Sequence, residues 1–108
     1  MAIDNIDIID FIGIDKHTGE VKLVISDHLD WENTSTHLEI LECKINRYIN
    51  FIESGEIYEH KKDALEKSIV IEIVGKYNLP IEALEFYKKA NIFLMDLNIE
   101  VRFVPSMQ

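Results

Sequence analysis

The sequence predicts an α+β fold, a two-layer α/β sandwich with two helices on one face of a mixed four-stranded sheet. Four short segments alternate apolar and polar residues, which is typical of half-buried strands. Two longer segments repeat apolar residues at three- and four-residue steps, which is typical of helices that pack on one side. The order of the segments is β-β-α-β-α-β. The 108 residues suffice for one domain over 1–108, with loose termini at 1–5 and 105–108.

The first two strands are predicted over residues 6–14 and 21–26. The turn between them contains Gly19, which adopts a positive φ without steric cost. Val21, Leu23 and Ile25 then share one face of the second strand. The two strands therefore form an antiparallel hairpin.

The first helix is predicted to begin near Asn33 or at Thr36 and to end near Glu53, before a capping glycine at Gly55. Its apolar stripe consists of Leu38, Leu41, Ile45, Tyr48, Ile49 and Ile52. Residues 56–67 are rich in charge, and we expect a loop that contains a short helix around 61–66.

The third strand is predicted over 68–74, the second helix from Pro80 to about Leu97, and the fourth strand over 99–104. Two strand–helix–strand units favour parallel neighbours, so the hairpin makes the sheet mixed. The helices should cover the face that carries Ile69, Ile71 and Ile73. The order of the strands does not follow from the sequence.

Two groups of apolar residues exceed what the predicted core can bury, and they predict an interface. The other sheet face would carry Val24, Val70, Val74 and Val104 among Lys22, Glu72 and Arg102. The run Ile-Phe-Leu-Met at 92–95 cannot all face one layer. Contiguous exposed apolar surface usually marks an interaction site. We therefore expect a homodimer, unless the 56–67 segment or the N-terminal arm covers these residues.

The charge balance excludes several classes of partner. Twenty acidic residues outnumber eleven basic ones, giving a formal net charge of −9. Phosphate backbones and anionic lipid would be repelled, so we expect neither nucleic acid nor membrane as a partner, whereas a basic protein remains compatible. The single cysteine, the acidic N-terminus and the lack of a long apolar run predict a cytoplasmic protein.

One short stretch contains several reactive side chains at the junction between the second predicted strand and the first predicted helix. Asp27, His28, Asp30 and Trp31 lie there, and His37 follows in the helix. A histidine beside carboxylates can act as a general base or a metal ligand. The alternative is structural, with the aspartates bonding turn amides and Trp31 packing over the core edge.

No complete catalytic apparatus accompanies this patch, and no glycine-rich phosphate motif occurs. The spacing of the patch matches no zinc signature, so we predict no catalytic residues, no cofactor and no metal. The five residues are interpreted as a candidate interaction or ligand patch.

Three stretches carry a resemblance to a known family. They read Asp-Lys-x-Thr-Gly-Glu-Val at 15–21, Ile-Ser-Asp-His-Leu-Asp-Trp at 25–31, and Lys-Ile-Asn-x-Tyr-Ile-Asn-Phe-Ile-Glu-Ser-Gly at 44–55. With these, the chain resembles a family of small bacterial proteins of unknown function from Ile6 to Phe103. The resemblance implies a stand-alone bacterial cytoplasmic domain and transfers no activity or residue role.

Together these observations favour a protein that acts through protein–protein contact, with self-association as the first expectation. A specific version is an immunity-type inhibitor whose acidic surface neutralises a basic partner. The alternative is a small enzyme or ligand-binding protein that uses Asp27, His28 and Asp30. That alternative requires these side chains to converge in a concave pocket.

Overall fold

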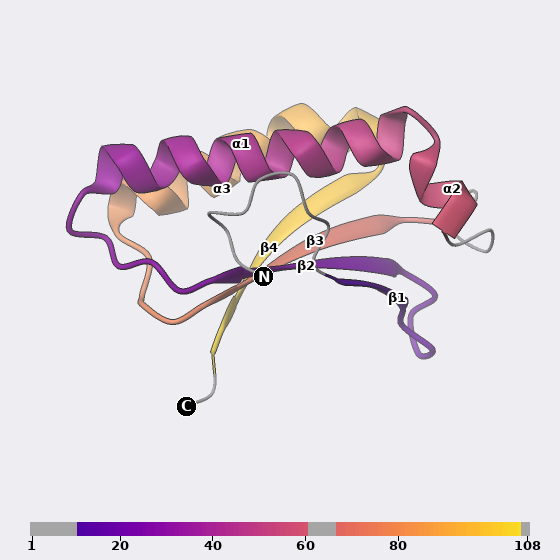
Figure 1. Cartoon of the computed structure of the whole chain (residues 1–108), viewed down its shortest axis with the longest axis horizontal. Coiled ribbons are helices and arrows are strands. Elements are labelled where there is room, and N and C mark those ends of the chain that lie inside the picture. Colours follow the sequence, from indigo (N-terminus) through magenta and orange to yellow (C-terminus); the bar gives the residue numbers. More distant parts are fainter. Residues whose placement is uncertain (1–10, 61–66, 107–108) are drawn as a thin grey trace.

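A computed structural model describes residues 11–60 and 67–106, and it confirms the α+β class with a mixed four-stranded sheet (Figure 1). One helix more than the predicted pair is present. The elements are β1 (Phe11–Ile14), β2 (Val21–Asp27), α1 (Thr34–Glu53), α2 (Glu56–His60), β3 (Ile69–Gly75), α3 (Ile81–Leu94), the 3₁₀ turn η2 (Met95–Leu97) and β4 (Ile99–Pro105). No helix in the described ranges is both long and apolar enough to cross a membrane.

The strands lie in the order β1-β2-β3-β4. β1 pairs with β2 antiparallel, while β3 is parallel to both β2 and β4. Each crossover therefore steps one strand further in the same direction, and crossovers of one hand then place their helices on the same side. Figure 1 shows α1 and α3 together above one face of the sheet.

The core lies between that face and the two helices. The predicted rows are confirmed, because Leu23, Ile25, Ile71 and Ile73 are fully buried. Val21, Ile69, Ile99 and Val101 complete them, and Phe103 is half-buried. The helix side of the core is formed by two sets of buried residues. The helix α1 contributes Leu41, Ile45, Tyr48, Phe51 and Ile52, and α3 contributes Ala83, Tyr87 and Leu94.

The helix α1 follows the earlier of its two predicted starts. The Asn33 side chain accepts a hydrogen bond from the Thr36 amide at 3.2 Å, so Asn33 is the N-cap and Thr36 lies inside the helix. Two polar residues, His37 and Lys44, are buried on the core side of α1. The apolar stripe alone did not predict their burial.

The loop expected over 56–67 is wrong for its first residues. Gly55 ends α1 with a φ of 84°, and the Ser54 hydroxyl accepts a hydrogen bond from the Glu56 amide. The chain then forms α2, whose Ile57 is fully buried. Ile57, together with the half-buried Tyr58 beside it, makes the short helix part of the fold. The helix expected around 61–66 and the strand residues 6–10 lie outside the described residues.

The second predicted helix is shorter than expected. It ends as an α-helix at Leu94, and η2 leads to Asn98, which has a left-handed φ of 60°. Asparagine tolerates this conformation better than most residues. The strand β4 then extends through Pro105, which was expected to close it. Because β4 is an edge strand, a proline without an N–H group is tolerated there.

On the second sheet face, which no described helix covers, the predicted valines are less exposed than expected. Val70 is only 1% exposed, and Val24, Val74 and Val104 are half-buried. The exposed apolar side chain on this face is Phe11, at 58%. We call this surface the open sheet face.

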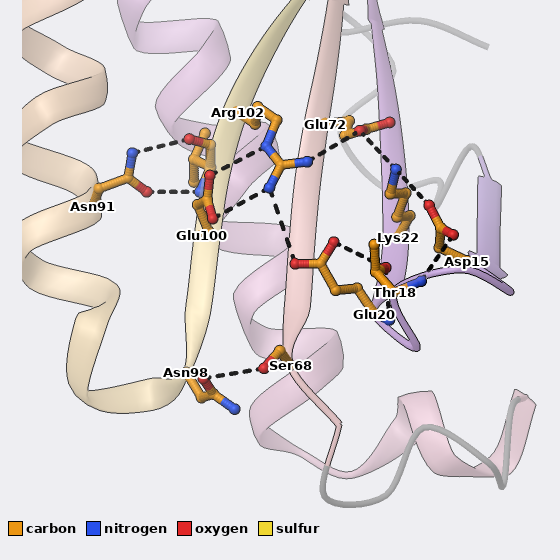
Figure 2. Close-up of polar contacts among 11 residues, drawn as sticks. Asp15, Thr18, Glu20, Lys22, Ser68, Glu72, Asn91, Asn98, Glu100 and Arg102 are labelled. Atoms are coloured by element: carbon orange, nitrogen blue, oxygen red, sulfur yellow. Dashed lines mark hydrogen bonds and ion pairs between the residues drawn. The ribbon is translucent and has the colours of Figure 1, made fainter.

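An ion-pair network crosses the open sheet face (Figure 2). The Lys22 ammonium lies 3.1 Å from Asp15 and 3.3 Å from Glu72. Arg102 contacts Glu72 at 3.8 Å and Glu100 at 3.2 Å. The pKa of Lys22 is raised by its bonds to Asp15 and Glu72, and the pKa of Arg102 is raised mainly by Glu100. The network thus pairs charges along the central strands instead of leaving apolar surface there.

The outer edge of β4 is closed by a side chain of α3. The Asn91 amide donates to the Val101 carbonyl at 2.9 Å, and the Val101 amide donates to the Asn91 oxygen at 2.7 Å. One side chain therefore replaces both hydrogen bonds of a neighbouring strand. This protects the edge against pairing with another chain.

Replacing Asn91 with leucine should destabilise the fold. Each buried backbone group of Val101 left without a partner costs about 1–3 kcal/mol. Chemical denaturation would measure the loss, and aggregation of the variant would report the freed edge. Asn50→Leu, at an exposed position of α1, is the control. Equal stability of the two variants would contradict the role given to Asn91.

Candidate functional site

The structure brings two of the five predicted patch residues into direct contact. Asp27 is the last residue of β2, and His37 lies in the first turns of α1. The Nε2 atom of His37 is 2.7 Å from Oδ2 and 2.9 Å from Oδ1 of Asp27. Each of these side chains is only 2% exposed. They form a buried carboxylate–imidazole pair that ties the end of β2 to the start of α1.

The rest of the His37 ring is also occupied. Its Nδ1 atom lies 2.8 Å from the backbone carbonyl of Asp30. Trp31 stacks on the ring, with centroids 3.5 Å apart and planes 13° from parallel. A carbonyl oxygen can only accept, so Nδ1 donates to Asp30, and a further hydrogen bond joins Nε2 to the Asp27 carboxyl group. The half-buried Trp31 thus packs over the pair, as the structural alternative expected.

The Asp30 side chain bonds the turn instead. It accepts a hydrogen bond from the Glu32 amide at 3.1 Å, which stabilises the turn before α1. His28 is exposed and follows Asp27 directly along the chain. Asp27 itself also accepts from the Leu29 amide at 3.2 Å. Of the residues named in the ligand-binding alternative, Asp27 therefore bonds His37, and Asp30 bonds the turn.

A tyrosine that the sequence placed only in the core lies close to the pair. The Tyr87 hydroxyl is buried and has no hydrogen-bond partner among the described residues. Burial raises the pKa of the Tyr87 phenol well above its usual range, and the charge of Asp27 raises it further. Nothing in the sequence signals this approach, because α3 is distant from Asp27 along the chain.

Gly75 provides the room for these aromatic rings beside Asp27. It pairs with Asp27 in the sheet, so both face the helices. A Cβ atom on Gly75 would lie 2.4 Å from the ring of Phe103. Phe103 in turn meets Tyr87 edge to face, with centroids 6.2 Å apart. Trp31 thus covers the His37 ring of the pair, and Phe103 and Tyr87 pack against each other over Gly75, the sheet neighbour of Asp27.

Two open depressions border the pair, and each is lined by one of its two residues. One, of about 280 Å³, is lined by His37 with His28, Leu29, Asp30, Asn33, Thr36 and Ile40. The other, of about 180 Å³, is lined by Asp27 with Ser26, His28, Val74, Lys76 and Ser106. Because the paired atoms are buried and bonded to each other, they are not presented to a substrate. In the described parts of the chain, no three His, Cys, Asp or Glu residues are grouped to hold a metal ion.

Comparison with known proteins identifies the family. A family model described as a family of unknown function, DUF6572, matches residues 1–106. The chain belongs to this family. No curated protein and no solved structure matches the chain. The family match confirms the resemblance seen in the sequence and adds no reaction, ligand or partner.

Breaking the buried pair should destabilise the fold strongly. His37→Leu leaves the Asp27 carboxylate buried without its partner, which costs about 3–5 kcal/mol. The double variant Asp27→Leu/His37→Leu removes both charges and should lose less than His37→Leu alone. Urea denaturation gives these values. His17→Leu in the exposed hairpin turn is the control, and a loss below about 1 kcal/mol for His37→Leu would show that the pair is not structural.

Removing the Tyr87 hydroxyl should stabilise the protein. A buried hydroxyl without a partner costs about 1–3 kcal/mol, so Tyr87→Phe should raise the free energy of unfolding. The matched control is Tyr48→Phe, because the buried Tyr48 hydroxyl donates to the Val24 carbonyl at 2.9 Å. That variant should lose stability. Loss in both variants would mean that the Tyr87 hydroxyl has a partner.

Proposed function

We propose that this protein acts through protein–protein contact made by the solvent-facing side of α3 and η2. The supporting observation is where the exposed apolar side chains lie. Eight large apolar side chains are exposed in the described residues, and six of them belong to this one segment. They are Ile81, Leu84, Ile92, Phe93, Met95 and Leu97, with exposed fractions between 42% and 75%.

This concentration exceeds what the fold of one chain needs. The core side of α3 uses only Ala83, Tyr87 and Leu94. Scattered apolar residues are normal on a surface, but a contiguous group on one helix usually marks an interaction site. An apolar partner surface would remove these side chains from water.

The exposed residues lie on two sides of α3. One side faces α1, where Phe93, Phe86 and Ile49 line a groove of about 360 Å³. The other side carries Ile81, Leu84 and Ile92, which Met95 continues at the start of η2; we call these four residues the outer stripe. By helical spacing these four residues share one face, with Lys88 at its centre.

The enzyme alternative receives less support. The Asp27 carboxyl group and the His37 imidazole are bonded to each other, and both side chains are buried away from solvent. A general base must reach a proton of the substrate, either directly or through one water molecule. The geometry therefore favours a contact function over catalysis.

An immunity-type inhibitor of a basic protein is the second candidate, and charge favours it. The chain carries a net charge of −9, and the network on the open sheet face contains four carboxylates but two cations. The carboxylates belong to Asp15, Glu20, Glu72 and Glu100, and the cations to Lys22 and Arg102. Such a contact would weaken with added salt.

Photo-crosslinking in the source cell tests which surface makes contact. A benzoylphenylalanine at position 92 should give a protein adduct, whereas one at position 39, exposed on α1, should not. Equal yields from the two positions would contradict the proposed use of α3. An adduct formed only from position 100, and lost at high salt, would favour the inhibitor candidate instead.

A further inference from the structure

We propose that the outer stripe of α3 binds the outer stripe of a second copy of this chain, with the two helices antiparallel about a twofold axis at Lys88. This inference rests on the proposed function, because it names the partner of the same surface. It follows from the spacing of the stripe, its charges and the closed edge of β4.

The spacing of the stripe reads the same in both directions. Ile81, Leu84, Lys88, Ile92 and Met95 follow one another at steps of three, four, four and three residues. In an antiparallel pair centred on Lys88, Ile81 therefore meets the second copy's Met95, and Leu84 meets its Ile92. A twofold interface requires one patch to be complementary to itself, and this arrangement meets that requirement.

The charges beside the stripe favour the same orientation. Glu85 precedes Lys88 by three residues, so both lie at the centre of the stripe. In an antiparallel pair the two Lys88 side chains meet at the twofold axis, and each has the second copy's Glu85 within one helical turn. A parallel pair in register would instead set Glu85 against Glu85 as well as Lys88 against Lys88. Complementary charges fix orientation and suppress wrong pairings.

The local charge of this surface is small. Two chains of net charge −9 repel each other as wholes. In α3 and η2, Glu82, Glu85 and Asp96 are offset by Lys88 and Lys89, which leaves −1. The segment that carries the outer stripe therefore adds little to the repulsion between two copies.

The neighbouring edge of the sheet does not offer an equivalent contact. Asn91 occupies the amide and the carbonyl of Val101, so strand addition at this point of β4 is blocked. Pro105 provides no N–H group further along the same edge. On this side of the molecule, α3 is therefore the element available for contact with another chain.

A charge-swap series tests the pairing. Sedimentation equilibrium of the purified protein should give twice the chain mass of 12.6 kDa. Glu85→Lys and Lys88→Glu should each raise the dimer dissociation constant at least about tenfold, because each sets like charges together. The double variant Glu85→Lys/Lys88→Glu should restore the dissociation constant of the wild-type dimer. Glu39→Lys and Lys16→Glu repeat the same charge changes at exposed positions elsewhere and should leave it unchanged.

The outcomes separate this inference from the proposed function. A wild-type protein that stays at 12.6 kDa up to millimolar concentration would overturn self-docking. The proposed function would then stand only if position 92 crosslinks to a different protein. A dimer that the double variant fails to restore would overturn the antiparallel pairing. Circular dichroism melting of each variant separates loss of the dimer from loss of the fold.

Discussion

The bond between Asp27 and His37 is the interaction on which the arrangement of the layers depends. It joins the end of a central strand to the first turns of the long helix, across ten residues of chain. A buried charged pair is stable only when its remaining bonding groups are also satisfied. Here the Leu29 amide and the Asp30 carbonyl supply those bonds, and Trp31 covers the ring. The connection between sheet and helix is thereby held in one geometry.

The polar groups of Asp27 and His37 thus serve the fold. The outer surfaces of the molecule differ from one another in the side chains they carry. Charged pairs span the open sheet face, and Asn91 closes the edge of β4. Among the described residues, most of the large exposed apolar side chains lie on α3 and η2. For this member of a family of unknown function, we therefore propose a contact surface as the functional feature.

Local pattern predicted most of the fold but not the environment of the site. Alternation placed the core rows, such as Leu23 and Ile71, because strand side chains have a period of two. Strand order depends on contacts between distant segments, so it did not follow. The helix α2 was missed because just two apolar residues, Ile57 and Tyr58, anchor it. Sequence proximity suggested Asp27 and His28 as partners, whereas the fold pairs Asp27 with His37 and brings Tyr87 toward them from another helix.

The account requires that the His37 ring is closed in the native protein, and chemical modification tests this most directly. Diethyl pyrocarbonate acylates accessible imidazole nitrogens, and peptide mass mapping reports each site. We expect the exposed His17 to react in the folded protein while His37 reacts only after denaturation. Reaction of native His37 as fast as His17 would show an open ring available to ligands, and would contradict a structural role for the pair.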